Sequence, residues 1–283
     1  MSADHNIFQE LKSYGQKSDA DMPLFATALA LAHLAHPGRS MSSYYHHMHK
    51  MCQLVAQRFE KLIDSNAADT AETRIAALKY VLHDQQGYCG NQEFYNDLRN
   101  ADMIEVIDRR KGLPVALAIL VIEVANAQGW SIQGLNFPWH FIVRIDHNGQ
   151  RVIFDPFHEF KILNAVDLRQ IIKAKQGAEA ELHAHYFDPV SAREIVLRLQ
   201  NNIKFRLIER EEYAAALNCV EQMKCFAPHE YRLLLDESVL RARLGQVEEA
   251  INCARDYYDH ATNPQDKYDA ELLLRTLENS FLK

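Results

Sequence analysis

The most apolar stretch of the chain runs from Pro114 to Ala127 and ends just before Gly129. Proline suits the first turn of a helix, where its missing N–H costs nothing, and glycine suits the residue that ends one. Only Glu123 and Asn126 interrupt the apolar run. A helix that is apolar around most of its circumference is buried, so the pattern predicts a core helix here.

Two alternating runs follow this helix, His140–Asp146 and Arg151–Asp155, separated by His147-Asn-Gly-Gln150. Asn-Gly between such runs is typical of a two-residue hairpin turn. That register pairs Ile142 with Asp155 and puts His140 on the same face as Asp155, as a diagonal neighbour within reach of its side chain. A further strand is expected at Ser131–Leu135.

The rest of the chain has helical periodicity. Asp69 and Glu72 are spaced as a capping box for the third of the expected helices. The expected helices are Met22–Ala35, Met41–Asp64, Thr70–His83, a run toward Arg110, Val166–Lys175 and several between Val190 and Lys283.

A repeat lies in the C-terminal helical part. Ala216-Leu-Asn-Cys219 recurs as Ala250-Ile-Asn-Cys253, a period of 34 residues that is typical of tetratricopeptide repeats. Pro228 and Pro264 fall just past the second helix of each pair. Two repeats are too few to stack independently, so we expect them to lean on the preceding domain or on the terminal helix Asp266–Phe281. The alternative is a generic pair of helical hairpins.

Composition and charge narrow the function classes. The 283 residues are 48% hydrophobic with a net charge of −7, which suits a globular protein and disfavours nucleic-acid binding. Neither a signal peptide in Met1–Asp21 nor an apolar run long enough for a membrane span is visible. Five cysteines without a C-x-x-C pattern favour free thiols in the cytoplasm.

Neither a metal nor a cofactor is expected from these patterns. The densest histidine group, His46-His47-x-His49, lies in an expected helix, where adjacent residues do not face each other. The scattered cysteines do not offer the matched ligand number and geometry of a zinc site.

A helix, then a histidine on one strand and an aspartate on the next, is the order found in transglutaminase-like and papain-like thiol enzymes. His140 and Asp155 are therefore the triad-like candidates. The helix start, Gly112-Leu-Pro-Val-Ala116, holds no Cys, Ser or Thr, so the nucleophile is missing. Cys89, in a Gly-rich loop, is a remote candidate for it. The alternative is that His140 and Asp155 form an ordinary hydrogen-bonded pair, or that Asp155 caps a turn.

The chain resembles the SirB-type bacterial proteins, which join a transglutaminase-like core to C-terminal tetratricopeptide repeats. The resemblance rests on motifs that stand in the family's order: Tyr88-Cys-Gly-Asn91, Asn100, Arg109-Arg-Lys-Gly-Leu-Pro114, Phe137-Pro-Trp-His-Phe141 and Asp155-Pro-Phe157. It implies an α+β fold that is mostly helical, with a small antiparallel sheet in a papain/transglutaminase-like core and an α-helical tail. The implied domains are a helical N-terminal cover over residues 1–86, a core over 87–189 and repeats over 190–283.

Two departures from the family pattern bear on the site. Trp139 stands where a Gly is usual, and His158-Glu-Phe160 stands where Gly residues are usual, so bulk could narrow or close a cleft. Asn91, Trp139 and His158 are the candidate binding residues.

The leading hypothesis is a non-catalytic scaffold or ligand- and protein-binding protein, with a protein or peptide partner held by the tail. The alternative is a hydrolase or transferase in which His140 and Asp155 activate water without a thiol. Regulatory partnership with a signalling or transcription factor is a third hypothesis, suggested by the family resemblance alone.

Overall fold

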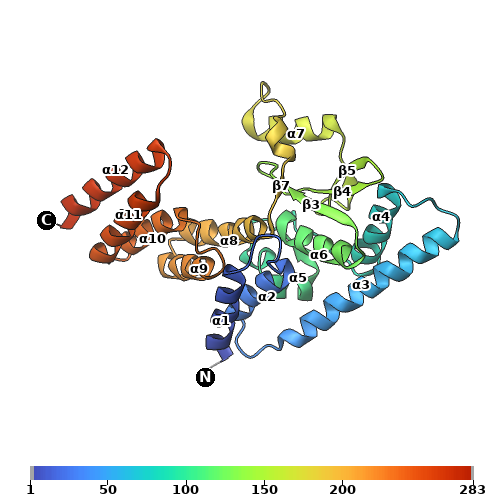
Figure 1. The fold of residues 1–283 in the computed structure, drawn as a ribbon, viewed down its shortest axis with the longest axis horizontal. Helices are drawn as coiled ribbons and strands as arrows, with labels where there is room; N and C mark the ends of the chain where they lie inside the picture. Colours follow the sequence, from blue (N-terminus) through green and yellow to red (C-terminus); the bar gives the residue numbers. More distant parts are fainter. Residues whose placement is uncertain (1–2, 282–283) are drawn as a thin grey trace. The chain divides into compact units, whose positions relative to one another are not determined.

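The computed structural model describes residues 3–281, which form two compact units. The core unit is Ser18–Leu199, and the repeat unit joins the chain up to Lys17 with the chain from Gln200 onward. Figure 1 shows the helices and strands of both units with their labels.

Helices make up most of the core unit. A π-helix, Lys79–Gln85, continues α4, and 3-10 helices cover Leu98–Asn100 and Ala184–Phe187. The α-helices are α2 (Leu24–Ala35), α3 (Met41–Asp64), α4 (Ala71–Leu78), α5 (Met103–Arg109), α6 (Pro114–Ala127) and α7 (Ala165–Gln176).

The sheet of the core unit is small and antiparallel. Its five strands lie in the order β6-β5-β4-β3-β7, and a separate parallel pair joins β1 to β2. The strands are β1 (Cys89–Gly90), β2 (Lys111–Gly112), β3 (Ser131–Leu135), β4 (Val143–His147), β5 (Gln150–Asp155), β6 (Lys161–Ile162) and β7 (Pro189–Val190). The predicted fold class, α+β with a small antiparallel sheet and a helical tail, is confirmed.

The two faces of the sheet are covered by different helices. Ile132 lines a pocket together with Ile122 of α6, whereas Leu135, on the opposite face of β3, belongs to a cluster with Leu168 and Ile172 of α7. Figure 1 shows α6 and α7 on either side of the strands. The predicted burial of α6 is confirmed, because 11 of its residues are buried.

The hairpin has the predicted two-residue turn. His147 pairs with Gln150, and Asn148 and Gly149 have φ of 47° and 79°, as a type I′ turn requires. The first strand is shorter than predicted: it begins at Val143, not at His140. The reason is a tight turn before it, in which the His140 N–H donates to the Pro138 carbonyl at 2.8 Å.

The cap of α4 also differs from the prediction. Thr70, not Asp69, is the N-cap, and its hydroxyl accepts a hydrogen bond from the Thr73 N–H at 3.1 Å. Asp69 instead accepts two hydrogen bonds from the Arg74 guanidinium, at 2.8 and 2.9 Å. The Asp69 carboxylate thus forms an ion pair with Arg74, and the Thr70 hydroxyl accepts the hydrogen bond of a first-turn N–H that has no partner within the helix.

The repeat unit is built from helical hairpins. Ala216 and Ala250, the matching positions of the 34-residue period, are both fully buried, in α9 and α11. The Ser238 hydroxyl donates to the Ala250 carbonyl at 2.7 Å, which joins α10 to α11. The helices are α1 (Ala3–Gly15), the end of α8 (Ala192–Glu209), α9 (Tyr213–Phe226), α10 (Arg232–Arg243), α11 (Val247–His260) and α12 (Pro264–Phe281).

The tandem helices rest on α12, the terminal helix of the prediction, because Leu277 of α12 belongs to a cluster with Ala250 and Ala254 of α11. A second neighbour, α1, was not predicted. Helix α1 packs against α9, because Gly15 lies against the Cys225 carbonyl with no room for a side chain. The predicted domain boundaries, at 86/87 and 189/190, remain a prediction. Between residues 3 and 281, no helix combines the length and apolar character needed to cross a membrane.

Candidate functional site

The triad-like pair predicted from the sequence is in contact in the structure. His140 Nε2 lies 2.7 Å from Asp155 Oδ2. A second histidine shares the same oxygen, because His158 Nδ1 lies 2.6 Å from Asp155 Oδ2. The two imidazole rings lie 5.5 Å apart between centroids and are tilted by 33°. The site therefore consists of two histidines that converge on one carboxylate.

Local backbone geometry brings these three side chains together. The turn at Pro138–His140, with Trp139 at φ 66°, places His140 just ahead of β4. Asp155 ends β5, and its Oδ1 accepts a hydrogen bond from the Phe157 N–H at 2.9 Å. This second bond fixes the carboxylate, so Oδ2 faces the histidines.

Burial and hydrogen bonding compete at Asp155, which is 1% exposed. Burial alone would raise the pKa of the Asp155 carboxyl, but the hydrogen bonds from His140 and His158 outweigh it and hold this pKa well below its usual value. The hydrogen bond with Asp155 raises the pKa of His158. The carboxylate is therefore charged at neutral pH, and the half-exposed His158 is drawn toward its cationic form.

The start of α6 carries no group that could act as a nucleophile. Leu113 is the N-cap residue and Pro114 occupies the first turn. Leu113 and Val115 are 1% and 2% exposed. These side chains are packed into the core. The first turn of α6 therefore lacks a nucleophile and is also closed to solvent at these two residues.

A buried polar network holds the segment before α6. The Asn100 carbonyl accepts from the Leu113 N–H at 2.8 Å, while its side-chain Oδ1 accepts from Asn91 at 3.0 Å and from Arg109 at 2.9 Å. Its amide donates to the Phe94 carbonyl at 2.7 Å. The candidate binding residue Asn91 is thus 5% exposed and bonded within the protein. The sequence motif contained Asn100 and Arg109, but gave no sign that they meet.

The remaining candidate nucleophile, Cys89, lies in β1 and pairs with Lys111 of β2. The next residue, Gly90, packs closely against Phe157. Phe157 in turn lies 5.9 Å from His140 between ring centroids. The Gly-rich loop therefore approaches the histidine site, as the flanking glycines suggested.

Trp139 and Phe160, the two bulky residues that depart from the family pattern, differ in their burial. Trp139 is 60% exposed, so most of its side chain lies at the surface and not in the core. Phe160 is 5% exposed and lies against Leu117 and Leu120 of α6, where the remaining void is about 10 Å³. A void of that size barely admits one water molecule. Phe160 thus fills the space beside the first turns of α6.

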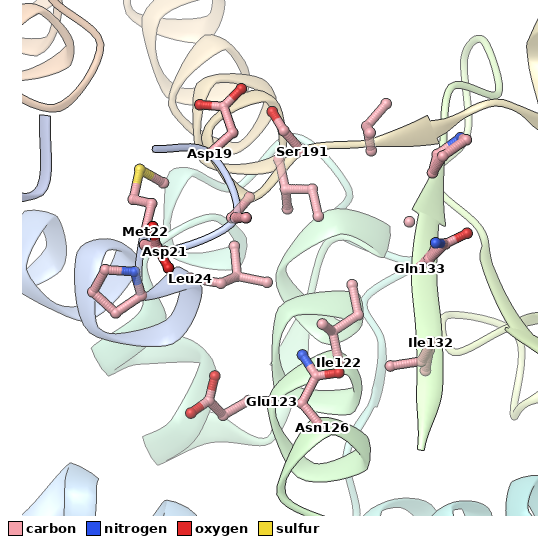
Figure 2. A pocket seen from close by; sticks show the side chains of 17 residues that line it. Asp19, Asp21, Met22, Leu24, Ile122, Glu123, Asn126, Ile132, Gln133 and Ser191 are labelled. Atoms are coloured by element: carbon pink, nitrogen blue, oxygen red, sulfur yellow. The ribbon is translucent and has the colours of Figure 1, made fainter. Parts of the chain in front are cut away.

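A pocket of the core unit lies elsewhere, and no predicted site residue lines it. It encloses about 600 Å³ between the segment at Asp19–Leu24, α6, β3 and the residues around Ser191 (Figure 2). Much of its polar lining is already engaged. Asp19 accepts from Arg193 at 2.7 Å, Asp21 from Ser18 at 2.6 Å and Gln133 from Arg144 at 2.6 Å.

Known proteins resemble the chain along most of its length. A UPF0162 protein of Xylella fastidiosa (strain Temecula1 / ATCC 700964) is 28% identical over 244 residues, which cover 84% of each chain. A UPF0162 protein of Vibrio cholerae is 27% identical over 210 residues, or 74% of this chain and 76% of that protein. F-box only protein 21 of Mus musculus is 26% identical over 184 residues, which are 62% of this chain and 29% of that protein.

Family models match both parts of the chain. The tetratricopeptide repeat model matches residues 203–276, which confirms the repeat assignment made from the 34-residue period. The model of the transglutaminase-like superfamily matches residues 42–201, which include α6, the hairpin and the histidine site. With more than half of its length matched, the chain belongs to the transglutaminase-like superfamily.

Proposed function

We propose that the protein is a non-catalytic binding protein or scaffold, whose transglutaminase-like domain has no thiol chemistry and whose repeats hold a protein partner. The observation that carries the proposal is the entry of α6. Leu113, Pro114 and Val115 are buried there, and none of the three can form a covalent intermediate.

The filled space beside α6 supports the same proposal. Phe160 packs on Leu117 and Leu120, in the region where a thiol enzyme of this order would need room for a substrate beside its nucleophile. Phe160 is part of the packed core, so its truncation to alanine would cost about 3–5 kcal/mol of stability.

The sharing of Asp155 also departs from a triad. In a Ser-His-Asp triad, the carboxylate orients one histidine, which acts as the base. Here Oδ2 of Asp155 serves both His140 and His158 at nearly equal distances. The arrangement suits a ligand held between two imidazoles at least as well as it suits proton transfer by one of them.

The catalytic half of the proposal is tested by amine-transfer and peptide-hydrolysis screens of the purified protein, with and without a thiol alkylator. We expect turnover in neither condition. Alkylator-sensitive turnover that disappears in both His140→Ala and Cys89→Ser would overturn the proposal and make Cys89 the nucleophile. The Cys225→Ser variant is the matched control, because Cys225 is also a half-buried free thiol but belongs to the repeat unit.

The alternative is a hydrolase or transferase that uses His140 and Asp155 without a thiol. It is favoured by one feature: Asp155 holds and orients the His140 imidazole through Nε2, at 2.7 Å. A neutral imidazole in this state can accept a proton from water. Turnover that is lost in His140→Ala but survives alkylation would establish this alternative.

The partner half of the proposal rests on the repeats, a class of structure that generally mediates contacts between proteins. Helix α12 exposes two large apolar side chains one turn apart, Tyr268 and Leu272, at 62% and 57% exposure. Such residues suit the apolar centre of a protein interface. Cross-linking of the full chain in bacterial cells should capture a partner that the Tyr268→Ser, Leu272→Ser double variant loses and His140→Ala retains. Equal capture by all three proteins would contradict the assignment to the repeats.

Two finer parts of the proposal rest on the sequence. The assignment to the SirB-type proteins rests on the motifs between Tyr88 and Phe157. A cytoplasmic location is supported by the five cysteines, all of which are free thiols in the structure. Fractionation of cells that express the protein from its own promoter tests the location.

A further inference from the structure

We propose that His140, Asp155 and His158 form a binding site for one divalent transition-metal ion, with zinc as the expected class. The potential ligand atoms of these three residues lie within 4.8 Å of one another. They are His140 Nε2, Asp155 Oδ2 and His158 Nδ1. The inference goes beyond the proposed binding role and does not depend on it.

The chemistry of the three ligands selects the class of ion. Two imidazole nitrogens and one carboxylate oxygen form the set that binds zinc, iron, cobalt or nickel, whereas magnesium and calcium prefer oxygen alone. Three protein ligands leave a fourth position for water or a small ligand, as in catalytic zinc sites. The carboxylate is the hard anionic member of this set, and its Oδ2 already faces both imidazoles.

The site is organised before any ion binds. Asp155 is 1% exposed, and its second oxygen is held by the Phe157 N–H at 2.9 Å. The Phe157 ring lies 5.9 Å from the His140 ring and 4.9 Å from the His158 ring. The hydrogen bond from the Phe157 N–H is an outer contact to a ligating carboxylate, and such contacts orient the carboxylate and strengthen metal binding.

The site is also open on one side. The His158 side chain is 49% exposed, whereas the His140 side chain is 13% exposed. Metal–ligand bonds of about 2.0–2.2 Å require ligand atoms roughly 3.2–3.6 Å apart in a tetrahedral site. The two N–O distances of 2.7 and 2.6 Å must therefore widen by less than ~1 Å. The exposed His158 can move to widen its own distance to Asp155, and the distance from His140 to Asp155 needs a shift of the same size.

Binding replaces two hydrogen bonds by coordination. In the metal-free protein, each imidazole donates an N–H to Asp155 Oδ2. When the ion binds, a neutral imidazole carries its proton on the other ring nitrogen, and an imidazolium releases its proton to water. The spacing of positions 140, 155 and 158 follows no short metal motif, so the sequence alone did not indicate this site.

The test uses the full chain after exhaustive treatment with a chelator. Cobalt(II) is titrated into the protein, and its visible absorption reports coordination by histidine nitrogen; zinc is then followed by calorimetry and by competition with the bound cobalt. We expect one site per chain. His158→Gln and Asp155→Asn should each weaken zinc binding by ~10-fold or more, since even outer contacts of a metal site are worth that factor.

Two controls separate this site from other histidines. The His46→Ala, His49→Ala double variant removes the exposed pair of α3, and His185→Ala removes one of two stacked histidines, His183 and His185. Both should bind the ion like the wild type. Binding that is absent from the wild type, or that the control variants lose while His158→Gln retains it, would overturn the proposal. Circular dichroism checks that His158→Gln, altered at a half-exposed position, remains folded.

The metal-loaded protein is also the form in which the water-activating alternative should be assayed. A bound zinc ion lowers the pKa of its water to about 7, which generates a nucleophile without a thiol. Cobalt absorption tests metal binding directly, whether or not the metal-loaded protein shows any turnover.

Discussion

A side chain cannot be added at Gly90 without meeting Phe157. A Cβ built at position 90 would lie 2.6 Å from the Phe157 ring and 2.6 Å from its main-chain oxygen. This contact joins β1 to the turn that carries His158, and therefore sets the position of the histidine site relative to the loop of Cys89.

Gly90→Ala should accordingly destabilise the protein by about 1–3 kcal/mol, because forcing a methyl group into a packed contact displaces the backbone. The measurement is the free energy of unfolding from urea titration. Cys89→Ala, one residue earlier, should cost less, since it removes a half-buried atom and adds none. Equal stability of Gly90→Ala and the wild type would show that β1 and the turn can move apart freely.

The network around Asn100 gives a second prediction. Asn100 is fully buried and bonds through its side chain to Asn91, Arg109 and the Phe94 carbonyl. Asn100→Ala leaves several of these groups without a partner, at a cost of about 2–4 kcal/mol. The exposed Asn96→Ala is the control and should change the free energy of unfolding by less than ~0.5 kcal/mol. Similar effects of the two substitutions would contradict a structural role for Asn100.

Continuous local patterns predicted much of this fold. The bounds of α3 and β3 were predicted residue by residue, because each has an uninterrupted period of its own. The predicted turn at Asn148-Gly149 also fixed the register of β4 and β5. In these cases the chemistry that sets the structure lies within a few neighbouring residues.

Short strands and convergent side chains were not predicted in the same way. Strands β1, β2, β6 and β7 have two residues each, too few for any alternation. Strands β1, β2 and β7 form because segments distant in the sequence pair, and β6 forms because the chain turns back on β5. His158 was a candidate binding residue, but its contact with Asp155 depends on the turn after β5. The position of the Trp139 side chain likewise depends on the positive φ of Trp139 itself, 66°, which sequence patterns do not reveal.

The pH dependence of stability should include a contribution from His47. Its Nε2 lies 2.8 Å from the Tyr88 hydroxyl and 3.2 Å from Arg110 Nη1. Burial, followed by the charge of Arg110, lowers the pKa of His47 to about 4. The unfolded chain, with an ordinary histidine pKa near 6.5, therefore binds more protons between about pH 4 and 6.5.

It follows that His47 contributes stability fully above about pH 6.5 and loses this contribution as the pH falls toward 4. Partial exposure limits the total to about 1–2 kcal/mol. Urea titrations at a series of pH values should show a shallower acid-side slope for His47→Gln than for the wild type. His49→Gln, exposed on the same helix, should retain the wild-type slope. Identical slopes for wild type and His47→Gln would contradict the lowered pKa.

The entry of α6 gives the last prediction, in which stability and activity separate. A Cβ at Gly112 would lie 3.1 and 3.3 Å from the two methyl groups of Val106 and 3.4 Å from Leu117, so the larger Gly112→Val side chain must displace them. Pro114→Ser removes a buried apolar ring that is preorganised for the first helical turn. Each substitution should cost about 1 kcal/mol or more, which corresponds to a fall in Tm of roughly 2–4 °C per kcal/mol.

Thermal melts followed by circular dichroism provide the measurement, and Ala127→Ser, at the exposed end of the same helix, provides the control. If the helix entry is a packed structural element, Pro114→Ser lowers the Tm, Ala127→Ser leaves it near the wild-type value, and neither variant gains turnover in the amine-transfer screen. Unchanged melting of both Gly112→Val and Pro114→Ser would mean that the entry tolerates new side chains. A hydroxyl at position 114 would then have room to approach a substrate, and the argument against a nucleophile at this helix start would lose its structural basis.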